Sequence, residues 1–335
     1  RREGGGAVDA VELEAGGRAA TVRARAGVVL ACGGFEANGE MQRQYFEAAG
    51  TLPASFLGNT GDGITMAQEL GADLWHMWHF HGPYGFRHPD PAFRYGLYAK
   101  NFPMWTPGHH PQPLPRMPWI IVDQAGRRFA NEYEPYPGDT GVRHFAHFDA
   151  VRAAHTRLPA FMLLDAEGFG LYPLGRAIAN DPALDFEWSR DNAHELALGI
   201  FRRADSLGAL AGAIGIDAAP LAAQVARWNA ACDAGEDAEF GRRPETMLPL
   251  RTPPFYAAEL WPLVINTQGG PVHDAEQRVL DVRGRPIEGL YAAGELGSVF
   301  GHVYVAGGNL AECLVGGRHA AEHLAVRAHA ARCRA

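Results

Sequence analysis

The sequence predicts an α/β fold in which one domain is assembled from both ends of the chain and an α+β domain is inserted between them. Apolar strand-like runs that end in glycine lie near both termini, at Gly27–Ala31 and Leu290–Ala293. A middle of mixed helical and strand patterns separates them, and 335 residues exceed what one ordinary core holds. We therefore expect a terminal domain of residues 1–35 and 255–335 and an inserted domain of residues 36–254.

Composition and charge exclude several classes of protein. Hydrophobic residues make up 47% and charged residues 20% of the chain, which is typical of a globular protein. The net charge of −8, with no basic block interleaved with aromatics, argues against a nucleic-acid partner. No apolar run approaches the ~18 residues of a membrane span. The four cysteines have neither metal-ligand spacing nor a disulfide pattern, so we expect a reducing, cytoplasmic location, with any signal lying before Arg1.

The N-terminal residues predict a hairpin and then a buried strand. Residues 7–15 and 20–30 either alternate between apolar and polar residues or form apolar runs, and a Gly16-Gly17 turn separates them. The strand Gly27–Ala31 then ends at Cys32-Gly33-Gly34-Phe35. Glycine at a strand end lets a ligand or another backbone approach closely.

Helical patterns follow the first strand and recur through the middle of the chain. One begins near Ala37, and a second follows Gly61-Asp62-Gly63, with Thr60 or Asp62 as its N-cap and Gly71 as its end. Residues 82–118 are irregular and proline-rich, which predicts a functional loop or a linker. The remaining middle elements are a hairpin at 118–134, a strand at 159–165, helices at 191–206 and 217–233, and helix ends or a loop at 207–216.

The C-terminal segment returns to strands and closes with a helix. Residues 254–282 have strand character, residues 290–293 form a final strand, and a helix follows at 309–328. Gly294 turns the final strand so that Glu295 stands at its carboxyl end, where doubly wound sheets bind ligands.

Glycines also precede the final helix, at Gly307-Gly308-Asn309. A helix N-terminus favours negative charge, and glycines let a ligand approach its free N–H groups. One carboxylate and one helix N-terminus suit a flavin, because Glu295 can accept hydrogen bonds from the ribityl hydroxyls. A glycine-rich loop of an unrelated enzyme and plain tight packing remain open from the residues alone.

An ordered set of motifs covers nearly the whole chain. It comprises Gly33-Gly34-Phe35, Gly61-Asp62-Gly63-Ile64, Gly126-x-Arg128-Phe129-x-Asn131-Glu132, Val225-x-Arg227-Trp228-Asn229, Asp237-x-Glu239-Phe240-Gly241-Arg242, Thr267-x-Gly269-Gly270, Arg278-Val279-Leu280-Asp281, Pro286-Ile287-x-Gly289-Leu290-Tyr291-Ala292-Ala293-Gly294-Glu295, Gly307-Gly308-Asn309 and Gly317-Arg318. This set resembles the FAD-dependent family that includes soluble fumarate reductase, urocanate reductase and 3-ketosteroid dehydrogenase.

The resemblance implies a flavoprotein oxidoreductase with FAD as its cofactor and a small molecule as its substrate, while its electron acceptor or donor stays open. It implies a partial Rossmann-like FAD-binding domain made by the two termini, and an inserted capping domain that closes over the substrate. The residues that it places at the cofactor are Gly33, Gly34, Asp62, Gly63, Gly294, Glu295, Gly307, Asn309 and Leu310.

One element of the family is missing from the sequence. The dinucleotide fingerprint, a strand followed by G-x-G-x-x-G and a helix, is absent, since no apolar strand precedes Gly58–Gly63. The pyrophosphate and adenosine half of the FAD site is then expected upstream on the same gene or on another polypeptide.

Three positions distinguish the branches of the family. Where fumarate reductases carry a histidine and two arginines for carboxylates, this chain has Asn266, Val305 and Tyr136. Arginine is suited to bidentate carboxylate binding and valine cannot replace it, which argues against a dicarboxylate substrate.

The replacements match the ketosteroid dehydrogenase pattern instead. Tyr136 follows Asn131-Glu132 as the tyrosine base does there, and Tyr304 and Gly308 match the pair that holds the keto oxygen. The resemblance implies that Tyr136 removes an α-proton while the β-hydrogen leaves as hydride to the flavin, or that the reverse reaction occurs. A reductase of an unsaturated carboxylate and a catalytically silent flavin-binding subunit are the alternatives.

Histidines and one asparagine complete the expected substrate pocket. His81 lies near the position of a substrate-binding histidine in relatives, and the resemblance adds Asn266 and His302, which is close to Tyr304 in sequence, to the substrate pocket. The His76–His81 stretch could suggest a metal, but zinc needs three or four converging ligands, so no metal is expected.

Overall fold

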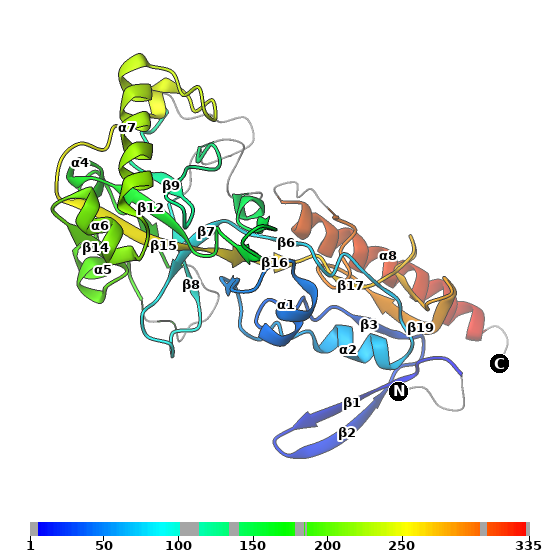
Figure 1. The fold of residues 1–335 in the computed structure, drawn as a ribbon. Helices are drawn as coiled ribbons and strands as arrows, with labels where there is room; N and C mark the ends of the chain where they lie inside the picture. The colour runs from blue at the N-terminus through cyan, green and yellow to red at the C-terminus, as the bar shows by residue number, and fades with distance from the viewer. Residues whose placement is uncertain are drawn as a thin grey trace. The chain divides into compact units, whose positions relative to one another are not determined.

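The computed structural model describes residues 6–100, 114–133, 141–177, 184, 186–301 and 307–332, and it divides into two compact units (Figure 1). The terminal unit comprises residues 1–47, 57–80 and 266–335, and the inserted unit comprises residues 48–56 and 81–265. These boundaries differ from residues 35 and 254 of the sequence prediction. The first boundary moves because two helices after the strand at Gly27–Ala31 pack in the core of the terminal unit. The second boundary moves because the long strand after residue 254 belongs to the central sheet of the inserted unit.

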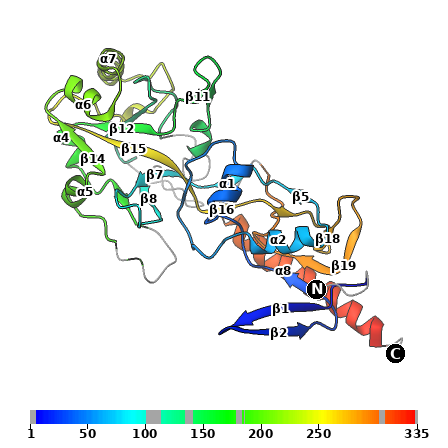
Figure 2. The same ribbon diagram turned by 60° about the horizontal axis from the view of Figure 1, so that its bottom comes forward.

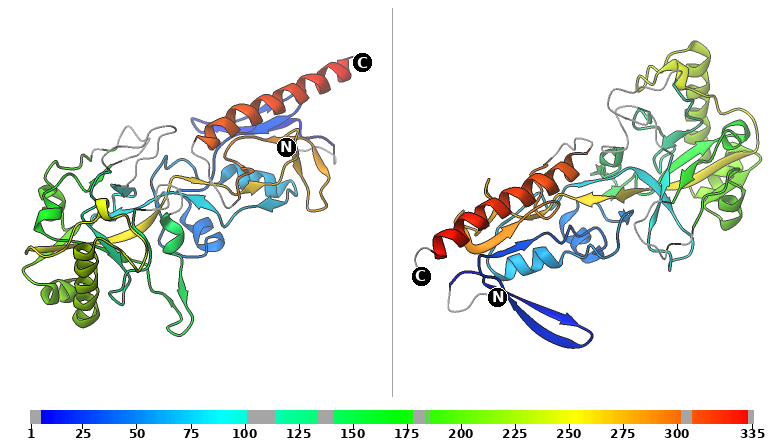
Figure 3. Two further views of the ribbon diagram at one scale, coloured as in Figure 1. Left: turned by 90° about the horizontal axis from the view of Figure 1, so that it is seen from above. Right: turned by 180° about the vertical axis from the view of Figure 1, so that it is seen from behind.

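A three-stranded sheet organises the terminal unit. Its order is β18 (Arg278–Leu280), β19 (Pro286–Ala292) and β3 (Val28–Leu30), and β19 pairs with β3 in parallel. The long helix α8 (Gly308–Arg332) contacts β19, and α2 (Asp62–Glu69) lies on the opposite side of the strands (Figures 1 and 3). The N-terminal and C-terminal strands therefore form one layer, although nearly the whole chain separates them in sequence.

The predicted N-terminal hairpin is confirmed (Figure 2). Strands β1 (Ala10–Ala15) and β2 (Arg18–Arg23) pair antiparallel around Gly16 and Gly17, whose φ angles are +59° and +73°. Two consecutive positive φ angles are what a two-residue hairpin turn requires, and glycine adopts them without a steric cost.

Two helices follow β3 in the terminal unit. Asn38 caps α1 (Gly39–Tyr45), because its Oδ1 accepts from the backbone N–H groups of Glu40 at 3.1 Å and Met41 at 3.0 Å. The N-cap of α2 is Gly61, so the prediction of Thr60 or Asp62 at that position was wrong. Gly61 has φ +81° and donates its N–H to the carbonyl of Gly34 at 3.0 Å, a conformation and a contact that a larger residue would disturb.

Short strands complete this unit and connect it to the other. They are β5 (Leu74–Trp75), β16 (Asn266–Thr267) and β17 (Gly270–Pro271), with β6 (Phe80–His81) at the boundary between the units. The core of the terminal unit is apolar, and its fully buried members include Phe35, Ile64, Ala67, Val279 and Leu296.

An eight-stranded sheet forms the centre of the inserted unit. The main path runs β13 (Gly175–Arg176), β8 (Gly96–Ala99), β7 (Tyr84–Arg87), β15 (Phe255–Val264), β12 (Ala160–Leu164) and β9 (Ile120–Val122). In addition, β14 (Phe201–Ala204) pairs antiparallel and β4 (Leu52–Pro53) parallel with β15. The other elements are β10 (Phe148–Asp149), β11 (Ala154–His155), α4 (Ala166–Phe169), α5 (Ala193–Leu198), α6 (Leu207–Ile214), α7 (Ala218–Ala234), η1 (Gly141–His144) and η2 (Pro244–Thr246).

Both faces of this sheet are buried. Along β12, Met162 and Leu164 enter one apolar cluster, whereas Phe161 and Leu163 enter a second cluster that includes Val225 of α7. Side chains alternate across a strand, so a continuous apolar run indicates cover on both sides. This confirms the strand predicted at 159–165.

Three predicted elements of the inserted unit were wrong. The stretch 82–118 is not wholly irregular, since β7 and β8 pair within it. The second arm of the hairpin at 118–134 is a single bridge between Val122 and Arg128. The helix at 191–206 ends at Leu198, because Gly199 adopts φ +84° as its C-cap, and β14 follows. Residues 207–216, for which the sequence allows helix ends or a loop, contain the helix α6. The helix predicted at 217–233 is confirmed as α7.

A buried ion network joins two of the sequence motifs in the inserted unit. Arg128 donates twice to Glu132, at 2.8 Å for both bonds, and twice to Asp237, at 3.1 and 3.0 Å. All three side chains are about 1% exposed. Although burial disfavours the charged guanidinium, the two carboxylates raise the pKa of Arg128. The network shows that Arg128 is ion-paired and gives its motif a role in folding.

Candidate functional site

The loop after β3 is packed against the strand that carries Thr267. Thr267 Oγ1 accepts from the backbone N–H of Phe35 at 3.2 Å. A side-chain carbon on Gly34 would lie 1.9 Å from this oxygen and 2.9 Å from Glu295 Oε1, so only glycine fits. Gly33, with φ +76°, leaves room in the same way for the side chain of Asn59. The two predicted glycines therefore let three polar side chains converge on the strand end.

The start of α2 lies beside the same strand end. A carbon added to Gly63 would lie 2.5 Å from Cys32 Sγ and 2.9 Å from Leu296 Cδ2, so this glycine allows the helix to approach closely. Asp62 is exposed in the first turn, where its Oδ1 accepts from Thr60 Oγ1 at 3.0 Å. Gly63 therefore lies in the closely packed part of the site, whereas the side chain of Asp62 lies at its solvent-exposed edge.

Glu295 stands at the carboxyl end of β19 and meets a second carboxylate. Gly294, with φ +80°, turns the chain against Cys313 of α8. The Oε1 atoms of Glu295 and of Glu36 each accept from the same backbone N–H, that of Thr267, at 2.9 Å. Burial first, then the hydrogen bond with Glu36 and its charge, raise the pKa of Glu295 well above its usual range.

Side chains that the sequence analysis did not predict fix the loop after Glu295. Glu312 of α8 accepts from Ser298 Oγ at 2.7 Å and from the N–H of Val299 at 2.6 Å. Trp75 Nε1 donates to the carbonyl of Gly297 at 3.0 Å, and His76 Nδ1 lies 2.9 Å from the carbonyl of Ser298. Trp75 and His76 therefore hold the loop in place within the terminal unit. The sequence signal for these two residues is the aromatic and histidine-rich stretch that begins at Trp75.

Several buried polar atoms around this site have no hydrogen-bond partner among the described residues. They are Glu36 Oε2, Asn266 Nδ2, Gln268 Nε2 and Oε1, and Asn309 Oδ1. Glu36 and Gln268 are both fully buried. Because an orphaned buried polar group is costly, such groups indicate a missing polar ligand or water. A ligand with many hydroxyls, carbonyls and ring nitrogens fits this donor and acceptor set.

The N-terminus of α8 borders the site. Gly307 has φ +79° and accepts from the N–H of Ala311, and Gly308 is the first residue of the helix. A carbon added to Gly308 would lie 2.6 Å from the ring of Phe300. The N–H groups of a first helical turn lack acceptors within the helix, so this end can receive an electron-rich group. Leu310, by contrast, is 74% exposed on the outer side of the turn.

Four predicted residues are not among those described at this strand end. Tyr136, Tyr304 and His302 lie outside the described residues. His81 is buried and belongs to the inserted unit. Their roles stay predictions. Within the described ranges, no three His, Cys, Asp or Glu side chains gather as a metal site would need.

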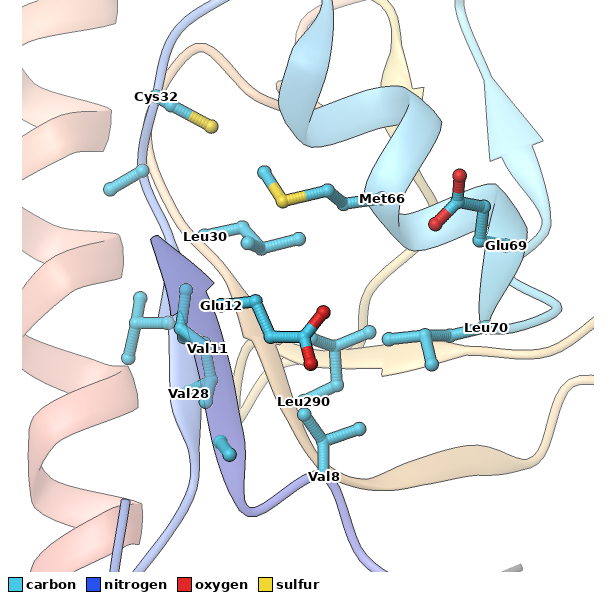
Figure 4. Close-up of a pocket in the computed structure, with 13 residues that line it drawn as sticks. Val8, Val11, Glu12, Val28, Leu30, Cys32, Met66, Glu69, Leu70 and Leu290 are labelled. Carbon is cyan, nitrogen blue, oxygen red and sulfur yellow. The ribbon is translucent and has the colours of Figure 1, made fainter. Parts of the chain in front are cut away.

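A hollow of about 920 Å³ lies along β3 in the terminal unit (Figure 4). Its lining is mostly apolar and comes from the hairpin, from β3 and from α2, as Val11, Leu30 and Met66 illustrate. In the described part of the chain β3 pairs with β19 alone, so its other edge is open beside this hollow. An open edge of a parallel strand is normally covered by a further strand.

A comparison with known families decides the relationship. The family model described as an FAD binding domain matches residues 2–310, which is most of the chain. The chain belongs to this FAD-binding family. Membership confirms the family suggested by the motifs and implies FAD binding as a property of the family.

Curated relatives of this FAD-binding chain include several oxidoreductases. It is 31% identical over 92% of its length to "3-oxosteroid 1-dehydrogenase" of Mycobacterium tuberculosis, of which it covers 54%. It is also 31% identical over 91% of its length to "4-oxocyclohex-2-ene-1-carboxylate 5-dehydrogenase" of Sinomonas cyclohexanicum, of which it covers 52%. The chain thus spans about half the length of the curated relatives that it matches.

The chain is also similar to a solved structure of the same kind of oxidoreductase. The 3-ketosteroid Δ1-dehydrogenase of Sterolibacterium denitrificans, in complex with 1,4-androstadiene-3,17-dione, matches 96% of the FAD-binding chain with a TM-score of 0.74 and 29% identity. This chain covers 59% of that protein. The mixed α/β fold is therefore that of part of this enzyme. Where the helices are described, none combines the length and apolar character needed to cross a bilayer.

Proposed function

We propose that this chain is the isoalloxazine-binding portion of an FAD-dependent oxidoreductase that forms or reduces a C=C bond next to a carbonyl, in the manner of ketosteroid dehydrogenases. The terminal unit would hold the flavin end of FAD, and the inserted unit would cap the substrate. The observation that carries the proposal is the similarity to the mycobacterial 3-oxosteroid 1-dehydrogenase over 92% of this chain. The name of the Sinomonas relative also describes a cyclic ketone.

The polar atoms of the terminal unit fit a flavin. Glu295 is half-buried at the end of β19, beside Gly34, and Asn266 and Gln268 nearby carry polar atoms that have no partner in the described part of the chain. Glu295 would bind the ribityl chain, and the N-terminus of α8 would face the electron-rich side of the ring. When bound, FAD supplies the acceptor or donor of a hydride.

Protein residues would handle the proton and the carbonyl. Tyr304 O–H and the N–H of Gly308 would donate to the keto oxygen, which makes the neighbouring carbon acidic. Tyr136 would then remove the α-proton as general base. Gly308 heads α8, where its N–H has no helical acceptor. The roles of Tyr136 and Tyr304 in this proposal rest on the sequence pattern alone.

Replacing Tyr304 with Phe is expected to slow reduction of bound flavin by a ketosteroid about 10²–10³-fold, because one donor to the developing oxyanion is lost. Rapid-mixing absorbance of the flavin measures this rate. Tyr291→Phe is the matched control, since Tyr291 is a buried residue of β19 whose hydroxyl lies 2.8 Å from His323 Nδ1. An unchanged rate in Tyr304→Phe would remove this residue from the proposed reaction.

A carboxylate substrate is the rival function, since the chain is 29% identical to "Acrylate reductase flavoprotein subunit" of Shewanella woodyi. Asn266 and Val305 lack the charge that such a substrate needs. Full-length protein loaded with FAD separates the two functions. We expect anaerobic bleaching of the flavin by a 3-ketosteroid and no effect of succinate, and we expect reduced flavin to be reoxidised by an enone rather than by acrylate. The opposite pattern would favour the rival.

The open edge of β3 offers a place for the missing half of the FAD site. The hollow of about 920 Å³ beside it is lined by apolar residues such as Val28 and Leu70. We expect a strand–glycine turn–helix segment to pair with β3 there, from the same gene or from another polypeptide. A full-length protein that stays colourless after addition of FAD would contradict this proposal, whereas a protein that binds FAD but exchanges no hydride with any ketone would support the silent-subunit alternative.

A further inference from the structure

Two carboxylates from opposite ends of the chain meet at one backbone donor. Glu36 follows β3, Glu295 follows β19, and the Oε1 atom of each lies 2.9 Å from the N–H of Thr267. Both oxygens also surround Gly34, since a carbon added there would lie 2.9 Å from Glu295 Oε1 and 3.1 Å from Glu36 Oε1. A side-chain hydrogen bond with Glu36 also acts on Glu295, so the two carboxyl groups are neighbours.

The surroundings do not offset two negative charges. Glu36 is fully buried and Glu295 is half-buried. Among the described residues, neither carboxylate forms an ion pair with an arginine, lysine or histidine, and the shared donor from Thr267 is a single N–H. Cys313 of α8 is the other titratable group that acts on Glu295, whereas Asp62 of α2 acts on Cys32. Two carboxylates at contact distance without a cation cannot both stay ionised at low cost.

We propose that Glu36 and Glu295 share one proton at neutral pH, so that an acid–carboxylate pair with a single negative charge stands beside the cofactor position. The shared proton then supplies the donor for the hydrogen bond between the two carboxyl groups. Among the described residues, the fully buried Glu36 Oε2 has no hydrogen-bond partner that would offset a full charge. The raised pKa of Glu295 agrees with this assignment.

The pair changes what Glu295 can offer a cofactor. An isolated carboxylate only accepts hydrogen bonds, whereas the protonated pair can also donate one. It also places one negative charge, rather than two, near an anionic dinucleotide. Glu36 acts here as a positioning residue that sets the proton on Glu295. This consequence rests on the proposed FAD binding, but the shared proton does not.

The proposal makes stability depend on pH in a defined direction. An acid whose pKa is raised on folding binds more protons in the folded state than in the unfolded state. Its contribution is complete below the ordinary glutamate value of about 4.3 and is lost as pH rises through the raised pKa of Glu295. Unfolding by urea across that window should show stability falling with pH in the native chain, and falling less steeply in Glu36→Gln.

Infrared spectroscopy of the full chain without FAD tests the proton directly. The native protein at pH 7 should show the carbonyl band of a protonated carboxylic acid, shifted in deuterated water. In Glu36→Gln and in Glu295→Gln the pH at which this band disappears should fall by about 1–3 pH units, since a neighbouring charge is removed. Glu14→Gln, an exposed change on β1, should leave the midpoint unchanged.

Two outcomes would overturn the proposal. The band could be absent from the native protein at pH 7, a result that no folding defect of a variant can confuse. Alternatively, its midpoint could stay unmoved in both glutamine variants, which would place the proton on another carboxyl group. A separate titration with FAD, followed by quenching of flavin fluorescence, tests the proposed function, so that failure of FAD binding leaves the infrared result standing.

Discussion

Replacing Gly34 with Ala is expected to cost about 3 kcal/mol or more of folding free energy and to prevent FAD binding. The added carbon would lie 1.9 Å from Thr267 Oγ1, far inside van der Waals contact. Thr267 cannot move away freely, because its Oγ1 accepts from Phe35 and its N–H donates to Glu36 and Glu295. Overpacking of this kind typically costs 1–3 kcal/mol, and the broken hydrogen bonds add to it.

Urea unfolding gives the stability, and hydrogen exchange of the β3 and β19 amides shows whether the loss lies in the terminal unit. Gly317→Ala is the matched control in the same unit, because nothing lies within 4 Å of a carbon added to this helical glycine. It should be neutral or stabilise by about 0.5–1 kcal/mol. Equal stabilities of the two variants would contradict the packing described around Gly34.

Replacing Arg128 with Ala is expected to destabilise the inserted unit by about 3–5 kcal/mol. The change leaves Glu132 and Asp237 buried without their shared cation. It also removes a guanidinium that lies over the ring of Trp228 at 4.5 Å from the ring centre. The fluorescence of the buried Trp119 and Trp228 during urea unfolding reports on this region.

Arg203→Ala provides the contrast for this prediction. Arg203 pairs with Asp205 at 3.1 Å, but their side chains are 49% and 81% exposed, so the loss should stay below about 1 kcal/mol. Arg128→Met tests a second expectation, that an apolar side chain in this position still leaves Asp237 without a cation and Glu132 with Arg242 alone, at 3.5 Å. If Arg128→Ala lost no more stability than Arg203→Ala, the network would not hold the inserted unit together.

The elements that the sequence predicted correctly are those with local signals. Alternation around Gly16-Gly17 gave the hairpin, and an uninterrupted apolar run gave β12. The failures are tertiary in origin. The helix predicted at 191–206 stops at Gly199, and the next residues, Phe201–Ala204, pair with β15, a partner that lies more than fifty residues later. No local pattern carries that information.

The site divides in the same way. Gly34, Gly294 and Glu295 were predicted because their motif places them at strand ends, where the structure has them. Glu36 was not predicted, since its meeting with Glu295 depends on the parallel pairing of β3 with β19 and leaves no trace in either segment. Glu312, which holds the loop after Glu295, was missed for a related reason: a glutamate in a helical pattern normally faces solvent.

The pairing of β3 with β19 also has a consequence for the order of events during synthesis. Val28–Leu30 leave the ribosome long before their partners, Leu290–Ala292. Until those partners are made, β3 and the helices α1 and α2 keep apolar faces uncovered. During this time the inserted unit is synthesised and can complete its own sheet. A nascent chain stalled after residue 265 should therefore expose a chaperone-binding surface that release of the full-length chain removes.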